Sequence, residues 1–140
     1  MDQLILYYFR RYSKAGEVDK LTHCLAKYTL EICLLDYDLV NIPGSLLAAG
    51  SLWLSLYTLD PSLPRATLWS PNLEYYSGYS AKEVQAVLPR MAFNLRNAPM
   101  HETQCVQTKY KSGKFLRVAQ LEELKSLELA GLARIKGEDS

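Results

Sequence analysis

The side chains of Arg10, His23 and Lys27 are the best candidates for a binding site in this sequence. His23 and Lys27 are four residues apart, so on a helix their side chains are neighbours. Arg10 lies upstream and could fold back beside them. A guanidinium offers two parallel donors to a phosphate group, and lysine and histidine add single donors. The three residues could therefore hold a phosphoserine or phosphothreonine of a partner.

An ordinary solvent-exposed charged face explains the same three residues without any ligand. Helices in globular proteins usually carry such residues on the side away from the core, and periodicity alone favours this simpler interpretation. A second basic stretch also has two interpretations. Its cations would either complement the dipole at a helix end or form a docking surface for a partner. It comprises Lys109, Lys111, Lys114 and Arg117.

The chain offers little of the chemistry that an enzyme needs. A nucleophile requires a base within hydrogen-bond reach, and the only histidines, His23 and His101, are far apart and lie in no recognisable motif. His23 and Cys24 are adjacent and would point to different faces of a helix, which disfavours joint metal ligation. The glycines form no phosphate-cradling loop. We therefore expect no catalytic residues, no metal site and no cofactor.

Length and composition suit one globular domain. The chain has 140 residues, of which 49% are hydrophobic and 22% are charged, and its 16 basic and 15 acidic residues leave a net charge of +1. This balance argues against wholesale binding to nucleic acid or to an anionic membrane. The three cysteines are too few and too scattered for a disulfide framework. A binding role must therefore come from a local cluster of side chains.

A long helix over residues 18–36 is predicted to position His23 and Lys27. Its apolar residues recur every three or four positions and form one stripe, while Lys20, His23 and Lys27 fall on the opposite face. The helix should therefore have a buried side and a basic outer side. The stripe comprises Val18, Leu21, Leu25, Tyr28, Ile32 and Leu35.

The next helix, over residues 43–59, is predicted to be central and buried. The 21 residues from Leu39 to Leu59 carry no charge, which is enough to span a bilayer. Pro43 and several small polar residues interrupt the stretch, and the neighbouring amphipathic helices could cover it, so a buried helix of a water-soluble bundle is favoured. The small residues 48–50 suggest that other helices cross closely there.

Three further helices complete a predicted bundle of five. A short one follows Ser70 and stops at Gly78. The fourth, over residues 80–95, opens with a capping box formed by Ser80 and Glu83, and Pro89 should bend it. The fifth covers residues 102–112. Residues 1–15 are interpreted as an apolar turn and a basic segment that end another unit, and Leu121–Leu132 could form one more helix.

Five strings resemble, in order, the C-terminal box of mitotic cyclins. Parts of two of them, RRYSKAGEVD and LLDYDLV, are more similar to the B type than to the A type. The strings are FRRYSKAGEVD (residues 9–19), LAKYTLEICLLDYDLV (25–40), SLLAAGSLWLSL (45–56), LEYYSGYS (73–80) and KYKSGKF (109–115).

The resemblance implies a cyclin-box bundle of five helices around a central apolar helix. Residues 1–16 would be the end of a first box and the linker, residues 17–126 the C-terminal box, and residues 127–140 a tail. The implied function is that of a regulatory subunit, or a fragment of one, of a cyclin-dependent kinase that controls mitotic entry and cell-cycle progression, in nucleus and cytoplasm. Such a subunit is not itself an enzyme.

The resemblance also bears on partners and on the site. Cyclins engage their kinase chiefly through a first box, whose motifs this sequence does not contain. Arg10, His23 and Lys27 match, position by position, a phosphate pocket of B-type cyclins that would read phosphorylated regulators or substrates. A phosphate pocket and a solvent-exposed charged face both remain possible interpretations of these three residues. The alternative function is that of a cyclin-fold transcription adaptor that binds DNA or protein, although the near-neutral charge argues against DNA. Nucleic acid and membrane are not expected partners.

Overall fold

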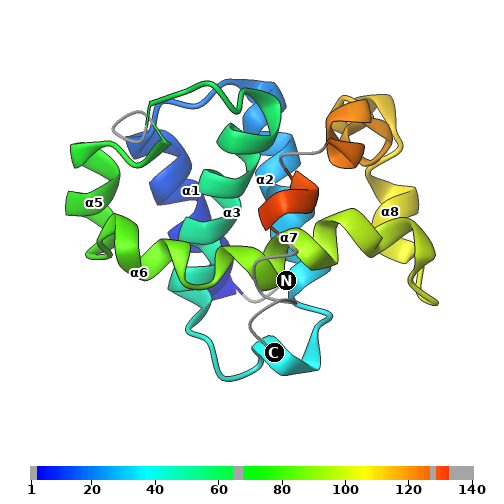
Figure 1. Ribbon diagram of the computed structural model, residues 1–140, viewed down its shortest axis with the longest axis horizontal. Helices are drawn as coiled ribbons and strands as arrows, with labels where there is room; N and C mark the ends of the chain where they lie inside the picture. Colours follow the sequence, from blue (N-terminus) through cyan, green and yellow to red (C-terminus); the bar gives the residue numbers. More distant parts are fainter. Residues whose placement is uncertain (1–2, 65–67, 127–128, 133–140) are drawn as a thin grey trace.

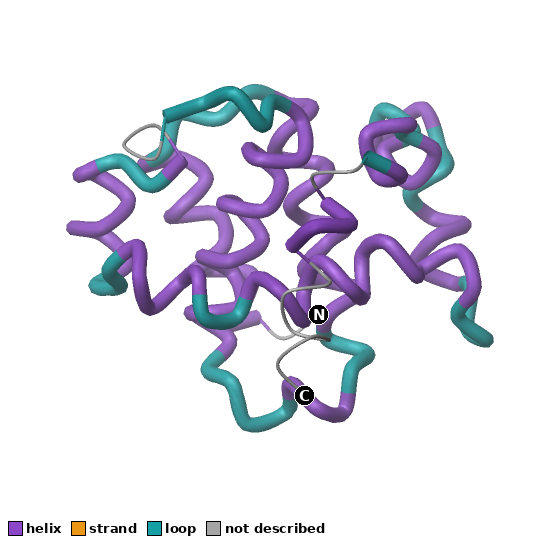
Figure 2. Tube along the Cα trace, viewed as in Figure 1, coloured by secondary structure: helices purple, strands orange, loops and turns teal. Residues whose placement is uncertain are grey.

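The computed structural model describes residues 3–64, 68–126 and 129–132, and within these ranges it contains helices and turns but no strand (Figures 1 and 2). The predicted all-α fold is confirmed. The α-helices are α1 (Gln3–Ala15), α2 (Lys20–Cys33), α3 (Gly44–Leu59), α5 (Pro71–Ser77), α6 (Ala81–Gln85), α7 (Leu88–Asn97) and α8 (Cys105–Lys109). The 3-10 helices are η1 (Tyr37–Leu39), η2 (Ala98–Met100), η3 (Gly113–Phe115), η4 (Val118–Gln120) and η5 (Glu122–Lys125).

Helix α3 is the buried centre of the fold. Its middle stretch, residues 47–55, is buried throughout, and it contacts α1, α2, α6 and α7. Figure 1 shows α1 and α2 on either side of it. A helix that is apolar on every side is stable only where other elements remove it from water. The predicted central apolar helix is therefore confirmed, and no helix in the described ranges is long and apolar enough to cross a membrane.

The small residues in the middle of α3 allow α7 to approach closely. A Cβ atom added to Gly50 would lie 2.7 Å from Sδ of Met91 and 3.3 Å from Cγ2 of Val87. Both of these side chains are buried. Glycine costs about 1 kcal/mol of helix propensity relative to alanine, and the close crossing explains why it is found here.

Helix α2 is shorter than the predicted helix at both ends. Asp19 caps its N-terminus, because the Asp19 carboxylate accepts a hydrogen bond of 2.8 Å from the backbone N–H of Thr22. At the other end α2 stops at Cys33. Asp36 then caps η1 by accepting a 2.9 Å bond from the N–H of Asp38. Asp19 therefore fixes the start of α2, and Asp36 fixes the start of the 3-10 helix that follows its end.

The predicted bend in the fourth helix is a complete break, which separates α6 from α7. The capping box is present, with Ser80 Oγ accepting from the Glu83 N–H and Glu83 Oε1 accepting from the Ser80 N–H, both at 3.2 Å. Pro89 lies in the first turn of α7. Proline lacks the N–H that a helix interior needs, and only the first turn tolerates that loss.

The prediction of a turn at residues 1–15 is wrong, because most of this segment forms α1. Phe9 and Tyr12 of α1 are buried, and the helix contacts α3 and α5. Ile5, Phe9 and Tyr12 are spaced by four and three residues, which places them on one helix face. Structurally, α1 is part of the same core as the other helices, while the proposed boundary at residue 16 stays a prediction.

The predicted tail, residues 127–140, lies largely outside the described residues. Leu129 and Ala130 are described, and both are buried. The helix predicted over Leu121–Leu132 is only partly observed, since η5 occupies residues 122–125 and a helical turn follows at residues 129–132.

Replacement of Gly50 by valine should destabilise the protein by about 1–3 kcal/mol, because the new side chain would overpack the crossing of α3 and α7. The matched control is Gly131→Val, since a Cβ at Gly131 meets no atom within 4 Å. Urea denaturation of both variants measures the free energy of unfolding. Equal stabilities would show that the crossing imposes no packing constraint.

Candidate functional site

A tight turn between α1 and α2 brings two parts of the candidate site together. The N–H of Gly16 donates to the carbonyl of Tyr12 at 2.9 Å, and the N–H of Glu17 donates to that of Lys14 at 3.1 Å. Glu17 adopts a positive φ of 52°, which turns the chain sharply. Asp19 then starts α2. The C-terminal end of α1 therefore lies next to the N-terminal half of α2.

His23 on α2 is held by two residues of α1. Oγ of Ser13 and Nδ1 of His23 are 2.7 Å apart and share a hydrogen bond. The Phe9 ring packs against the imidazole, with ring centroids 4.9 Å apart. Because Nδ1 is engaged by Ser13, Nε2 is the ring nitrogen that remains available to a ligand. Ser13 and Phe9 were not predicted from the sequence to have this role.

The Ser13–His23 contact contains the atoms of a nucleophile and a base, but its surroundings fit a positioning role. Ser13 is only 7% exposed, so its hydroxyl is withdrawn from solvent. Among the described residues, no carboxylate is hydrogen-bonded to the imidazole as the third member of a catalytic triad would be. The contact orients His23 and ties α1 to α2.

Arg10 and Lys27 lie close enough to His23 for their charges to act on it. The pKa of His23 is lowered from its ordinary value of 6.5, first by burial and then by the positive charges of Lys27 and Arg10. Arg10 is exposed, and Lys27 and His23 are half-buried. The structure therefore places together the three residues predicted from the sequence, which we name the basic trio (Arg10, His23 and Lys27).

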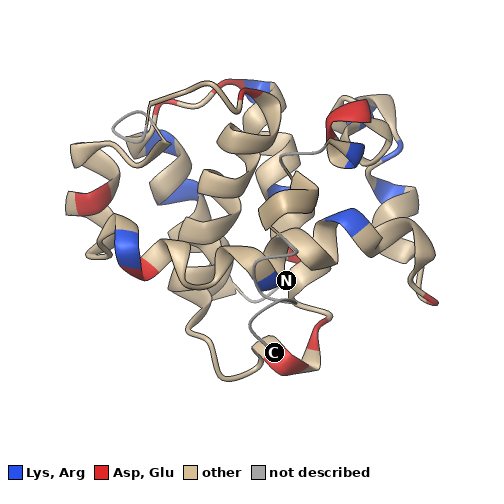
Figure 3. Cartoon of the chain, viewed as in Figure 1, with Lys and Arg blue, Asp and Glu red and all other residues tan. Residues whose placement is uncertain are grey.

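The basic trio has an unbalanced positive charge. Within the described ranges, neither Arg10 nor Lys27 forms an ion pair with an aspartate or glutamate. Figure 3 shows where the charged residues lie along α1 and α2. A dianion near these side chains would offset their positive charge, and arginine and lysine could donate hydrogen bonds to it. The arrangement is therefore chemically suited to a phosphate group.

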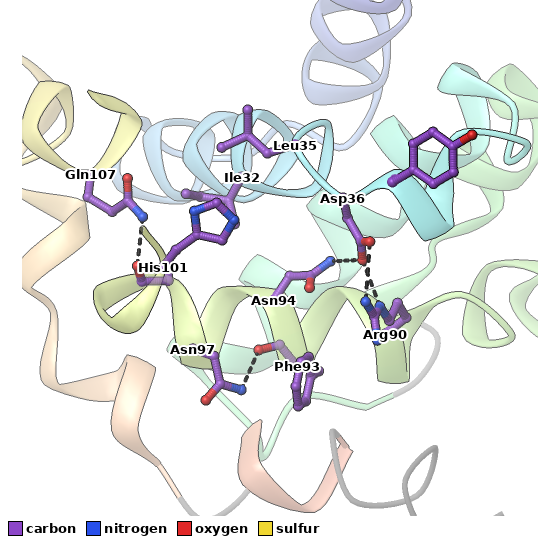
Figure 4. Close-up of a pocket in the computed structure, with 11 residues that line it drawn as sticks. Ile32, Leu35, Asp36, Arg90, Phe93, Asn94, Asn97, His101 and Gln107 are labelled. Carbon is purple, nitrogen blue, oxygen red and sulfur yellow. Dashed lines mark hydrogen bonds and ion pairs between the residues drawn. The ribbon is translucent and has the colours of Figure 1, made fainter. Parts of the chain in front are cut away.

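A second polar cluster lines a cavity of about 240 Å³ between the end of α2 and α7 (Figure 4). The Asp36 carboxylate accepts hydrogen bonds from Arg90 Nε at 2.6 Å, from Arg90 Nη2 at 3.2 Å and from Asn94 Nδ2 at 2.7 Å. The Arg90 bond is the main reason that the pKa of Asp36 is lowered. Arg90 also pairs with Asp38 at 3.1 Å.

These contacts identify the cluster around Asp36 as a structural clamp. The charge of Arg90 is matched by two carboxylates, so it is not free to bind an anion. His101 lines the same cavity, and its Nδ1 accepts a hydrogen bond of 3.1 Å from the N–H of Thr103. Of the two clusters, the basic trio is the one with charges left to engage a ligand.

Comparison with known proteins gives one consistent result. Residues 4–124 match the family described as "Cyclin, C-terminal domain". The chain is 39% identical over 129 residues to the G2/mitotic-specific cyclin-B of Patella vulgata, an alignment that covers 92% of this chain and 30% of that protein. It is 38% identical over 123 residues to the G2/mitotic-specific cyclin-B of Spisula solidissima, covering 88% and 28%.

A vertebrate relative shows the same pattern. The chain is 37% identical over 132 residues to the human G2/mitotic-specific cyclin-B2, covering 93% of this chain and 32% of that protein. The chain thus spans about 30% of the length of the curated relatives it matches.

The imidazole of His23 should titrate below 6.5 in the free chain, and its neutral form should contribute to stability. Since the unfolded state binds the proton more tightly, this contribution is complete above pH 6.5 and is lost as the pH falls through the folded-state pKa. NMR titration of the imidazole protons measures the pKa, and a His101→Gln variant assigns the two histidines. A His23 pKa above 6.5 would contradict the arrangement.

Proposed function

This chain belongs to the cyclin family, as a C-terminal cyclin domain of the mitotic B type, and we propose that it is part of a regulatory subunit of a cyclin-dependent kinase that controls mitotic entry. Its relatives carry the name of G2/mitotic-specific cyclins. In this proposal the kinase is engaged mainly through another domain, and the subunit works in nucleus and cytoplasm. The bundle described above serves as a scaffold and contributes no catalytic residue.

The specific role that we propose for this domain is to bind phosphorylated segments of regulators or substrates of the kinase. One observation carries this proposal: Ser13 and Phe9 orient His23 within electrostatic range of the cations of Arg10 and Lys27, and neither cation has an acidic partner among the described residues. Arg90 differs, because its charge is matched by the carboxylates of Asp36 and Asp38.

Each member of the basic trio has a distinct part in the proposed binding. The planar guanidinium of Arg10 can form two parallel hydrogen bonds to phosphate oxygens. Lys27 contributes a point charge, and Nε2 of His23 contributes one donor. A bound phosphate dianion would favour the imidazolium form of His23, because an opposite charge nearby raises the pKa of a base. Phosphate binding is therefore expected to be coupled to proton uptake by His23.

Replacement of both Arg10 and Lys27 by alanine should weaken binding of a phosphoserine peptide by about tenfold or more, because two charge-assisted contacts are lost. The probe is a ten-residue peptide with one phosphoserine and otherwise uncharged side chains, titrated into the 140-residue chain and followed by fluorescence anisotropy. The matched control is Lys82→Ala with Arg96→Ala, which removes the same charge from exposed positions on α6 and α7. Unchanged affinity in the Arg10/Lys27 variant would refute the phosphate site.

The assignment to kinase regulation is tested by affinity capture from a mitotic cell extract. The 140-residue chain, immobilised on resin, should retain phosphorylated regulators or substrates together with cyclin-dependent kinase complexes that contain them, identified by mass spectrometry. A nuclease-treated sample is the control, because retention that depends on DNA would favour the transcription-adaptor alternative. Recovery of DNA without any such kinase would overturn the proposal.

A further inference from the structure

Three lysine side chains from separate parts of the chain lie over the ring of Phe115 in η3. The ammonium nitrogens of Lys27, Lys109 and Lys114 lie 5.9, 5.6 and 5.5 Å from the ring centroid. Contacts of this kind attract a cation to the face of an aromatic ring. We name this group the Phe115 platform (Phe115 with Lys27, Lys109 and Lys114). It includes two lysines of the second basic stretch.

The core of the protein holds the platform in place. Phe115 packs on Tyr110 with ring centroids 4.7 Å apart, and Tyr110 packs on Tyr28 of α2 at 5.3 Å. Tyr28 and Tyr110 are both buried. Ser112 caps η3 by accepting a 3.2 Å hydrogen bond from the N–H of Lys114. The ring is therefore fixed relative to α2, and Lys27 reaches it from that helix.

Charge on the platform is only partly compensated. Lys109 forms an ion pair with Glu31, with Nζ 3.1 Å from Oε1 and 3.4 Å from Oε2. Lys27 and Lys114 have no such acidic partner within the described ranges. Two ammonium groups without an acidic partner in the described ranges thus lie over one aromatic ring.

Lys27 connects the platform to the basic trio. Its ammonium group lies over Phe115, and its positive charge also lowers the pKa of His23. Lys27 therefore belongs to both the basic trio and the Phe115 platform. A ligand that contacted only the trio would leave Lys114 without a counter-charge.

We propose that the Phe115 platform is a second anionic subsite, in which Lys27 and Lys114 take a second negative charge from the same peptide segment whose phosphate binds the basic trio. This inference rests on the proposed phosphate-reading function and specifies its ligand. The ligand is a phosphopeptide with a second anionic group, either a carboxylate or another phosphate, close to the phosphorylated residue. A peptide with a single isolated phosphate would engage the basic trio and leave Lys114 without an anionic partner.

The test compares peptides that carry one phosphoserine with peptides that carry a second charge. Glutamate or a second phosphoserine is placed in turn at each of the four positions on either side, and affinity for the 140-residue chain is measured by fluorescence anisotropy. At one or more positions the second charge should tighten binding by about two- to fivefold, the range expected for one exposed ion pair. Lys114→Ala should remove this gain and leave the affinity for the singly phosphorylated peptide unchanged.

The control variant is Lys82→Ala, which removes one exposed charge on α6 and should preserve the gain. A gain with glutamate identifies a carboxylate as sufficient, and a gain with phosphoserine alone identifies a second phosphate as the ligand. The subsite is overturned if no second charge tightens binding, or if Lys114→Ala leaves the gain intact. In either case the phosphate-reading function still stands, provided that the Arg10/Lys27 variant weakens binding of the singly phosphorylated peptide.

Discussion

Burial of α3 on all sides is the constraint on which the rest of this structure depends. An uncharged helix with no polar face can be removed from water only when several other helices surround it. In this chain α1, α2, α6 and α7 all contact it. Each of these helices turns its apolar side toward α3, so their polar residues lie on the outer surface. The position of the candidate site follows from this arrangement.

The site depends on α1 and α2 packing against α3 and being joined by a tight turn. Ser13 and Phe9 of α1 can then orient His23 of α2, while Arg10 and Lys27 remain at the surface. Burial and the two cations together favour the neutral imidazole in the free protein. A phosphate would reverse that preference. The same contacts that join the two helices therefore also orient His23 in the site that we propose for an anion.

The near-neutral overall charge conceals a local separation of acids and bases. The carboxylates of Asp36 and Asp38 pair with Arg90 at the junction of α2 and α7, and Glu31 pairs with Lys109. Arg10, Lys27 and Lys114 have no such partner among the described residues. Compensated charges hold elements together, whereas uncompensated charges are available to a ligand. The structural ion pairs are thereby identified, and the proposed phosphate site rests on cations that they leave unpaired.

The sequence by itself determined the features that depend on neighbours along the chain. The capping box at Ser80, the uncharged stretch of α3 and the shared face of His23 and Lys27 are local patterns that the structure contains. The predicted apolar stripe of α2 is present in part, since Leu25, Tyr28 and Ile32 are buried but Leu35 lies beyond the helix and is exposed. Helix ends were less predictable, because single caps decide them, such as the Asp19 side chain at the start of α2 and the Leu34 backbone at its end. The helix at residues 3–15 was missed, since its apolar residues are explained only once α3 and α5 cover them.

Only the tertiary structure decided the contacts between distant residues. Ser13 meets His23 across a turn, Arg90 reaches Asp36 from 54 residues away, and Lys109 reaches Glu31 from 78 residues away. No periodicity relates such positions, because their separation in sequence is set by loops and their proximity by packing around α3. The sequence could therefore nominate the basic trio, but the orientation of His23 and the platform at Phe115 required the fold.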